Sequence, residues 1–146
     1  RDKVFILSPL ERTSAEALEL GESLVRSIGA RALIMDPKRH DRLVAAISHL
    51  PYLLAVTLVN AADEVSRDDP LVWRLTASGF RDTSRVAASD MTMMLDILAT
   101  NRGHVLEILG RAQRHLSALM QYLEKQDLAH LRAALYAART RRADMF

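Results

Sequence analysis

The sequence predicts a mainly α-helical protein, a helical bundle preceded by a short βαβ unit. Within the first 36 residues, two short apolar runs flank one amphipathic segment, which is the pattern of a strand, a helix and a second strand. After residue 36 the apolar residues recur at steps of three and four, which indicates amphipathic helices. A chain of 146 residues can bury one hydrophobic core but not a second full-size domain.

The first strand is expected at residues 4–7, an apolar run that a Ser-Pro pair ends. A helix is expected over residues 15–28, where leucine, valine and isoleucine recur at near-helical spacing. Thr13 and Ser14 can cap its first turn, and Gly29 stands where a glycine commonly ends a helix.

A second apolar run at residues 32–35 completes the unit. Short connections through one helix make the two strands parallel. Parallel strands normally lie inside larger sheets that are covered on both faces. We therefore expect residues 1–36 to be the last part of a larger sheet, and residues 37–146 to form a separate helical domain.

The helical domain begins at Pro37, which suits a first helical position and which Asp36 can cap. Leucine and isoleucine continue at helical spacing as far as residue 58. Pro51 lies inside this helix and removes one backbone hydrogen bond, so we expect the axis to bend near Ile47 and Ser48.

Two further helices follow, each with an aspartate at its start. Asp90 caps the longest one, predicted from Met91 to about Lys125, and Asp127 caps the last. The region before Asp90 predicts shorter elements: a polar connection at 60–69, a short helix from Pro70 to near Gly79, a turn at 80–83 and a helical turn at 84–88.

The composition excludes several classes of function. The formal net charge is only +2, too small to attract a nucleic acid to the whole molecule, and the basic cluster Arg139–Arg142 is typical of a solvated helix end. The absence of cysteine excludes a thiolate nucleophile or metal site. Without a run of eighteen apolar residues we expect no membrane partner, and a cytoplasmic location.

The chain also lacks the motifs of cofactor and metal sites. Its five glycines never occur as G-x-G, which excludes a dinucleotide fingerprint and a Walker loop. There is no H-E-x-x-H motif, and His104 and His115 are predicted to be surface residues. We therefore expect neither a metal nor a cofactor bound to this chain.

The first candidate site lies around the proline of the first long helix. His49 and Tyr52 are three residues apart and face the same way, with His40 and Asp41 upstream on the same helix. The proline leaves one carbonyl without its usual partner, which can open a polar pocket. The alternatives are a core histidine with satisfied nitrogens, a tyrosine at the core edge, and His40 as a residue of the helix start.

The second candidate site is the segment from Gly79 to Asp90. Its short helical turn carries Arg85, with Ser89 one turn later. An arginine held on a rigid turn can bind a carboxylate through two parallel hydrogen bonds. The alternative is a local capping network in which Asp82 pairs with Arg85.

These segments resemble the C-terminal part of the prephenate/arogenate dehydrogenase family. The resemblance rests on His40-Asp41, Ile47-Ser-His-Leu-Pro, Gly79-Phe-Arg-Asp-x-x-Arg-Val-Ala-x-Ser-Asp and Asn101, in that order. It implies a Rossmann-type nucleotide-binding domain followed by a helical dimerisation domain. Residues 1–36 would then be the end of a truncated nucleotide-binding domain, and residues 37–146 the substrate-binding and dimerisation domain.

The resemblance also implies an activity. The family oxidatively decarboxylates prephenate, or arogenate, with NAD or NADP, in tyrosine biosynthesis. By similarity Arg85 binds a substrate carboxylate and His49 is a cleft histidine, so we expect both at one anion pocket. The family's polarising histidine belongs to the nucleotide-binding domain, so no catalytic residue is expected here. The chain is expected to be inactive alone and to form a homodimer through the helical domain, with the long helix at the interface.

Further residues are carried over by the same resemblance. Tyr52, Gly79 and Ser89 would contribute to substrate binding, and His40, Asp41 and Asp82 would support the site. Two departures weaken the match, because many members have a second histidine where Tyr52 stands and a tryptophan where Met94 stands. The helical domain of another NAD(P)-dependent dehydrogenase, or a non-enzymatic helical assembly module that uses the apolar stripe from Met94 to Leu123, remain alternatives.

Overall fold

The structure, a computed structural model, describes residues 2–145. Arg1 and Phe146, the outer ends of the two predicted domains, lie outside the described residues. The chain forms two compact units, of which the first ends at Val105 and the second begins at Leu106. This boundary falls inside one helix, α6 (Arg102–Glu124). The division predicted between residues 36 and 37 stays a prediction.

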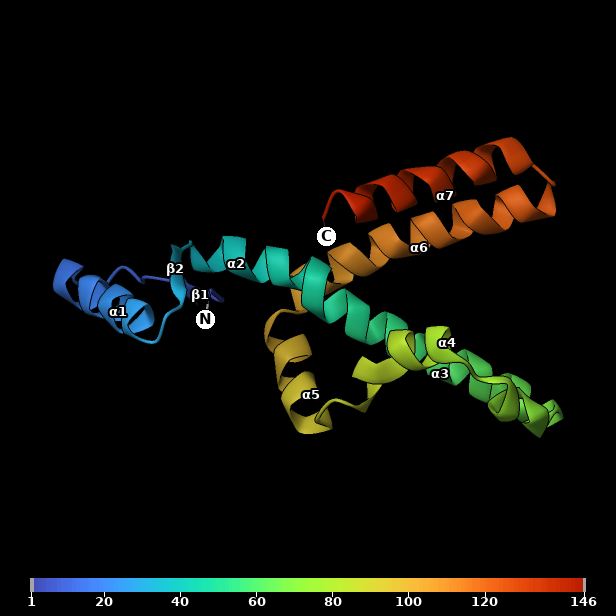
Figure 1. Ribbon diagram of the computed structural model, residues 1–146, viewed down its shortest axis with the longest axis horizontal. Coiled ribbons are helices and arrows are strands. Elements are labelled where there is room, and N and C mark those ends of the chain that lie inside the picture. Colours follow the sequence, from blue (N-terminus) through green and yellow to red (C-terminus); the bar gives the residue numbers. More distant parts are fainter. Residues whose placement is uncertain (1, 146) are drawn as a thin grey trace. The chain divides into compact units, whose positions relative to one another are not determined.

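The first unit begins with the expected βαβ arrangement. Strands β1 (Val4–Leu7) and β2 (Arg31–Ile34) pair in parallel, with helix α1 (Ala15–Ser27) between them in the sequence (Figure 1). The Ser14 hydroxyl accepts a hydrogen bond from the Ala17 amide at 3.2 Å and caps α1. Gly29 has φ 75°, the left-handed conformation that glycine adopts without a steric penalty. The predicted strand, helix and strand are confirmed.

The two strands leave much of their apolar surface uncovered. Val4 and Phe5 are each 52% exposed, and Ile34 is 46% exposed. Such exposure is unusual for a parallel sheet, which is normally covered on both faces. The expectation that these strands belong to a larger sheet stays a prediction.

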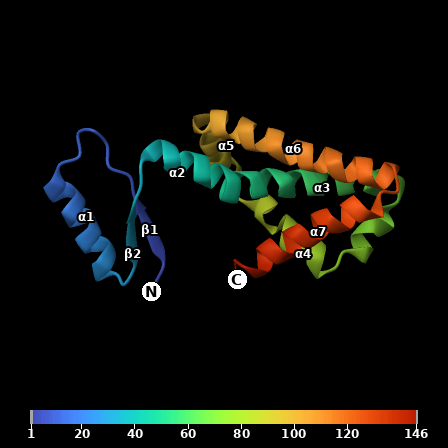
Figure 2. The ribbon, with the colours of Figure 1, turned by 90° about the horizontal axis from the view of Figure 1, so that it is seen from above.

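Helix α2 (Pro37–Val44), the π-helical turn η1 (Ala45–His49) and helix α3 (Leu50–Asp68) follow one another without a break, and Figure 2 shows them as one rod. Asp36 caps α2 by accepting from the Arg39 amide at 3.0 Å. In η1 the Leu50 amide donates to the carbonyl of Ala45, five residues earlier. Because Pro51 has no amide hydrogen, the helix widens before it instead of only bending.

The rod has a composition that is also found in membrane-spanning helices. Among residues 2–145, the stretch Pro37–Asp68 alone is long and apolar enough to cross a membrane, and its most apolar window has a mean hydropathy of 1.7. Core helices of soluble proteins meet the same criterion. The rod contains no unbroken run of eighteen apolar residues, as the sequence indicated, because polar residues such as Ser48 and His49 interrupt it.

Three predictions between Asn60 and Asp90 were wrong. The helix predicted from Pro70 to near Gly79 ends at Leu75. The polar connection at 60–69 is the last part of α3, because no glycine or proline interrupts residues 60–69 and Asp63 pairs with Arg67 one turn later at 3.2 Å. The turn at 80–83 lies within helix α4 (Ser78–Ser84). The 3-10 helices η2 (Pro70–Leu75) and η3 (Arg85–Ala88) precede and follow α4, and all three pack against α3.

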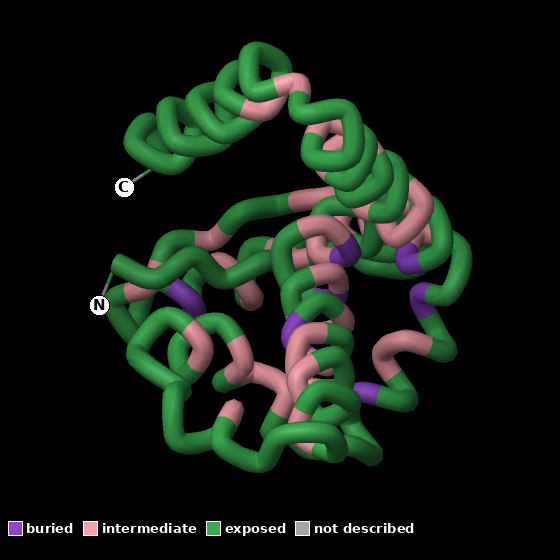
Figure 3. Tube along the Cα trace, turned by 90° about the vertical axis from the view of Figure 1, so that its right-hand side faces the viewer, coloured by how far each residue is buried: buried purple, intermediate pink, exposed green. Residues whose placement is uncertain are grey.

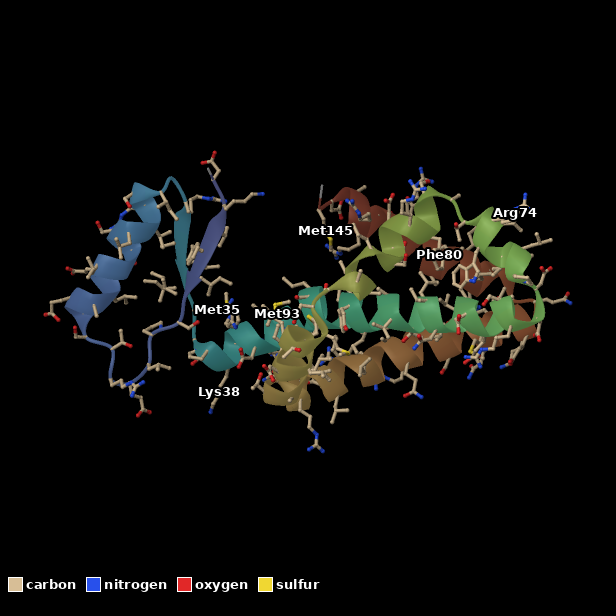
Figure 4. All side chains as sticks on the ribbon, turned by 90° about the horizontal axis from the view of Figure 1, so that it is seen from below. Met35, Lys38, Arg74, Phe80, Met93 and Met145 are labelled. Carbon is tan, nitrogen blue, oxygen red and sulfur yellow. The ribbon has the colours of Figure 1, made fainter. Side chains whose placement is uncertain are left out.

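An aromatic contact joins two of these short helices. Trp73 of η2 contacts Phe80 of α4 edge to face, with the ring centroids 6.0 Å apart. Phe80 is labelled in Figure 4. Such pairs contribute about 0.5–1.5 kcal/mol beyond the burial of their area. The contact fixes the start of α4, and α4 leads directly into the turn that carries Arg85.

The single helix predicted from Met91 to Lys125 is two helices, α5 (Met91–Thr100) and α6. Asn101, with φ −102° and ψ 24°, separates them. Its side-chain amide donates to the carbonyl of Asp41 at 2.7 Å, a contact across sixty positions that a helical pattern cannot show. The apolar stripe from Met94 to Leu123 is therefore divided between two helices.

The second unit consists of the rest of α6 and helix α7 (Leu128–Ala143), between which the chain reverses direction. The Asp127 carboxylate caps α7 by accepting from the His130 amide at 3.1 Å, and the His130 ring stacks on Tyr122. None of residues 106–145 is buried, and Figure 3 draws this helix pair in the exposed and intermediate colours. The buried apolar residues all lie in the first unit: Val25, Ala45, Ala55, Met94 and Val105.

Candidate functional site

The cavity that carries the candidate chemistry lies beside the π-helical turn. Its volume is about 330 Å³. Residues of α2 and η1 form one wall, and residues at the end of α5 form the other. The lining residues are His40, Asp41, Val44, Ser48, His49, Ile97, Thr100 and Asn101.

His49 is one of two buried polar residues that line this cavity, with 6% of its surface exposed, and Asn101 is the other. The Nδ1 of His49 lies 3.3 Å from the Nδ2 of Asn101, whose side chain is also held by the Asp41 carbonyl. His49 therefore fits both interpretations made from the sequence. It is a core histidine with a partner for one ring nitrogen, and it also lines a polar cavity.

The surroundings of His49 favour its neutral form. Burial lowers the pKa of His49, because a charged imidazolium loses its hydration there. The negative charge of Asp41 raises the pKa and His40 lowers it further, and both effects are smaller than that of burial. His40 itself lies against Asp41, with Nδ1 and Oδ1 3.0 Å apart. The cavity thus contains a neutral imidazole beside an exposed carboxylate.

Arg85 does not belong to this cavity. It lies on η3 with an exposed side chain, and it is not among the lining residues. The capping network that was the alternative for Arg85 is also not formed, because Asp82 is exposed and makes no ion pair with Arg85. η3 packs on α3, the helix that begins directly after His49. The expected anion pocket of Arg85 and His49 stays a prediction.

The remaining predicted residues lie around Arg85 or on α3. The Ser89 hydroxyl donates to the Val86 carbonyl at 2.7 Å and ends η3. Gly79 is exposed, and a Cβ there would meet nothing within 4 Å. Tyr52 is half-buried in the first turn of α3. None of these three lines the His49 cavity.

Asn101 is the functional candidate to which the sequence assigned no role. It is 9% exposed and joins the end of α5 to α2 and η1. The sequence includes Asn101 among the residues that carry the family resemblance, but that resemblance does not show which residue its side-chain amide meets. Among residues 2–145, no group of three histidine, aspartate or glutamate side chains could hold a metal ion.

Comparison with known proteins places this geometry in a family. The family described as "Prephenate dehydrogenase, dimerization domain" matches residues 36–137. The prephenate dehydrogenase of Bacillus subtilis is 33% identical over 87% of this chain and 34% of its own length. The prephenate dehydrogenase of Lactococcus lactis is 37% identical over 77% of this chain and 31% of its own length.

Solved structures agree with these relatives. The Synechocystis arogenate dehydrogenase superposes with a TM-score of 0.86 at 28% identity, over 98% of this chain and 52% of that one. The prephenate dehydrogenase of Aquifex aeolicus, in complex with hydroxyphenyl propionate and NAD+, gives a TM-score of 0.89 at 26% identity, over 98% of this chain and 50% of that one.

The chain therefore spans about a third of the length of these curated relatives and about half of the solved chains. The family match covers η1, η3 and Asn101, the segments on which the sequence resemblance rests. With a match over more than half of its residues, the chain belongs to the prephenate dehydrogenase dimerization-domain family.

Proposed function

We propose that this chain is the substrate-binding and dimerising part of a prephenate or arogenate dehydrogenase. The complete protein would oxidatively decarboxylate its substrate with NAD or NADP, on the route to tyrosine. The observation that carries the proposal is the family match over residues 36–137, which includes both the His49 cavity and the Arg85 turn. An assembly module alone would give no reason for the buried pair of His49 and Asn101.

Arg85 is suited to bind a substrate carboxylate. Its guanidinium is exposed and is not neutralised by Asp82, the acidic residue closest to it in the sequence. Its turn is held at one end by the Ser89 hydroxyl and rests on α3. A guanidinium can offer two parallel hydrogen bonds to a carboxylate, which the ammonium group of a lysine cannot do.

The residues of this chain do not fit a dinucleotide. No two of the five glycines form G-x-G, so the close backbone approach that a pyrophosphate needs is missing. NAD or NADP, and the histidine that polarises the substrate hydroxyl, would be bound or supplied by the rest of the complete protein. We expect the 146-residue chain alone to give no prephenate-dependent reduction of NAD+ or NADP+, measured as absorbance of the reduced nicotinamide.

The second unit supports a homodimer. Its α7 carries a groove lined by Leu128, Leu131, Arg132, Leu135, Tyr136 and Arg139, and no residue among 106–145 is buried. A helical hairpin without buried residues gains little from its own packing, so burial against a second copy would stabilise it. We assign the protein to the cytoplasm and propose neither a membrane nor a nucleic acid as a partner.

The test is the kinetics of Arg85→Ala in the complete protein. A charged hydrogen bond is worth about 1.5–3 kcal/mol, so the KM for prephenate should rise about ten- to a hundredfold while the KM for the cofactor stays unchanged. Arg81→Ala is the matched control, because Arg81 is also exposed and lies one turn earlier on α4. An unchanged KM for prephenate in Arg85→Ala would remove Arg85 from the site.

A further inference from the structure

We propose that Asn101 is a positioning residue that holds His49 in the neutral tautomer with its proton on Nε2. The ring then offers a hydrogen-bond donor, and not a base, to a ligand oxygen in the cavity. The inference rests on the proposed function for the identity of that ligand, but the tautomer itself follows from the contacts around the amide of Asn101.

The first step is the orientation of the amide. The Asp41 carbonyl can only accept a hydrogen bond, so the group 2.7 Å from it must be the amide nitrogen of Asn101 and not the amide oxygen. The orientation that is ambiguous for many asparagines is fixed here by a partner with a single role.

The second step transfers this constraint to the histidine. The same Nδ2 has a second hydrogen, and it lies 3.3 Å from Nδ1 of His49. Because the amide nitrogen only donates, Nδ1 must accept, and an accepting ring nitrogen carries no proton. In neutral His49 the proton is therefore on Nε2. In the imidazolium two donors would face each other at this contact.

The third step concerns the other ring nitrogen. The hydrogen bonds of the His49 side chain involve only Nδ1, and no buried side-chain nitrogen or oxygen among the described residues lacks a partner. Nε2 is therefore in contact with solvent, and the opening that His49 lines is the cavity of about 330 Å³. A ligand carbonyl, hydroxyl or carboxylate oxygen can accept from Nε2–H there.

The backbone around Asn101 makes the contact rigid. The backbone N–H of Asn101 donates to the carbonyl of Ile97 at 3.0 Å, and the backbone carbonyl of Asn101 accepts from the Val105 amide at 3.1 Å. Asn101 thus belongs to the last turn of α5 and the first turn of α6. The ionisable groups that act on the ring are Asp41 and His40, both from α2. The α5 wall of the cavity contributes Ile97, Thr100 and Asn101, none of which ionises.

The test is nuclear magnetic resonance of the chain labelled with ¹⁵N-histidine, recorded without substrate or cofactor at a pH above the ordinary histidine pKa. Long-range ¹H–¹⁵N correlations separate protonated from unprotonated ring nitrogens. The chain has five histidines, and the loss of one set of signals in His49→Gln assigns His49. We expect Nδ1 in the unprotonated range and Nε2 in the protonated range. A wild-type spectrum with the proton on Nδ1 would overturn the proposal.

Two variants separate positioning from a structural role. In Asn101→Asp a carboxylate can accept from Nδ1–H, so we expect the proton to move to Nδ1 and the pKa of His49 to rise. In Asn101→Ala, the variant to use if the aspartate prevents folding, both tautomers should be populated. Thr100→Val is the matched control, because the Thr100 hydroxyl bonds only within its own helix, to the carbonyls of Asp96 and Ile97.

Thr100 also lines the cavity, but its substitution should leave the proton of His49 on Nε2. If the Nε2–H tautomer persists in both Asn101 variants, Asn101 does not position the ring. Because no substrate is present, this result is independent of the kinetics of Arg85→Ala. A protein that binds no prephenate still reports the tautomer of His49.

Discussion

The apolar groove on α7 gives a quantitative prediction for the proposed dimer. Leu135 lines this groove and is 58% exposed. Full burial of a leucine side chain is worth about 1.5–3 kcal/mol, so covering the exposed part contributes about 1–2 kcal/mol. A two-fold dimer contains the residue twice, which doubles the value to about 2–4 kcal/mol. Leu135→Asp should therefore raise the dimer Kd about 30- to 700-fold.

The assay is sedimentation velocity over a dilution series that spans the wild-type Kd. Ala137→Asp is the matched control, because Ala137 lies on the same helix about half a turn away from Leu135 and outside the groove. It introduces the same charge into α7, so a general loss of helix stability would affect both variants. Equal dissociation of the two variants, or an unchanged Kd in Leu135→Asp, would refute the assignment of this groove to the dimer interface.

Two further predictions concern stability. Gly21→Ala should raise the free energy of unfolding by about 0.5–1 kcal/mol, because alanine is the better helix former and its Cβ would meet Leu7 at an ordinary 3.5 Å. Gly29→Ala should lower the free energy of unfolding by about 1–2 kcal/mol, because the φ of 75° at this position is unfavourable for a residue with a Cβ. Urea unfolding measures both, and similar effects at the two positions would contradict the argument. The pKa of Asp127 is lowered, mainly by the hydrogen bond from the His130 amide. The stability that this carboxylate contributes is therefore full above its pKa in the unfolded chain, and it is lost as the pH falls through its pKa in the folded protein. In Asp127→Asn that part of the acid dependence, followed by circular dichroism, should disappear, and an unchanged acid profile would exclude this role.

Most helix starts and the βαβ unit could be predicted because their causes are local. Ser14, Asp36, Asp90 and Asp127 each accept from an amide three residues later, and this contact depends only on sequence neighbours. Gly29 ended α1 for an equally local reason, its positive φ. Such elements need no knowledge of the tertiary structure.

The predicted helix boundaries were wrong where a distant contact ends a helix or where a run of polar residues continues one. Asn101 ends α5 while its amide reaches Asp41, sixty positions away, and neither residue signals this in the pattern. Residues 60–68 are polar because they face solvent on a continuing helix, and polarity alone does not distinguish such a face from a loop. The candidate site divided in the same way, since the order of motifs included both His49 and Asn101 but not the contact between them.

The π-helical turn at Ala45–His49 also sets an angle between two parts of the first unit. Each residue of a regular helix advances the chain by about 100° around the axis, and a π turn accommodates one residue more than a regular turn. If the residues from Ala45 to His49 wound as a regular helix, with no residue removed, the chain would turn about 100° further over this stretch. Everything upstream, including both strands, would then rotate by about 100° relative to α3. The azimuth of the sheet about the rod is thus set by this one wide turn, and the cavity of His49 lies beside it.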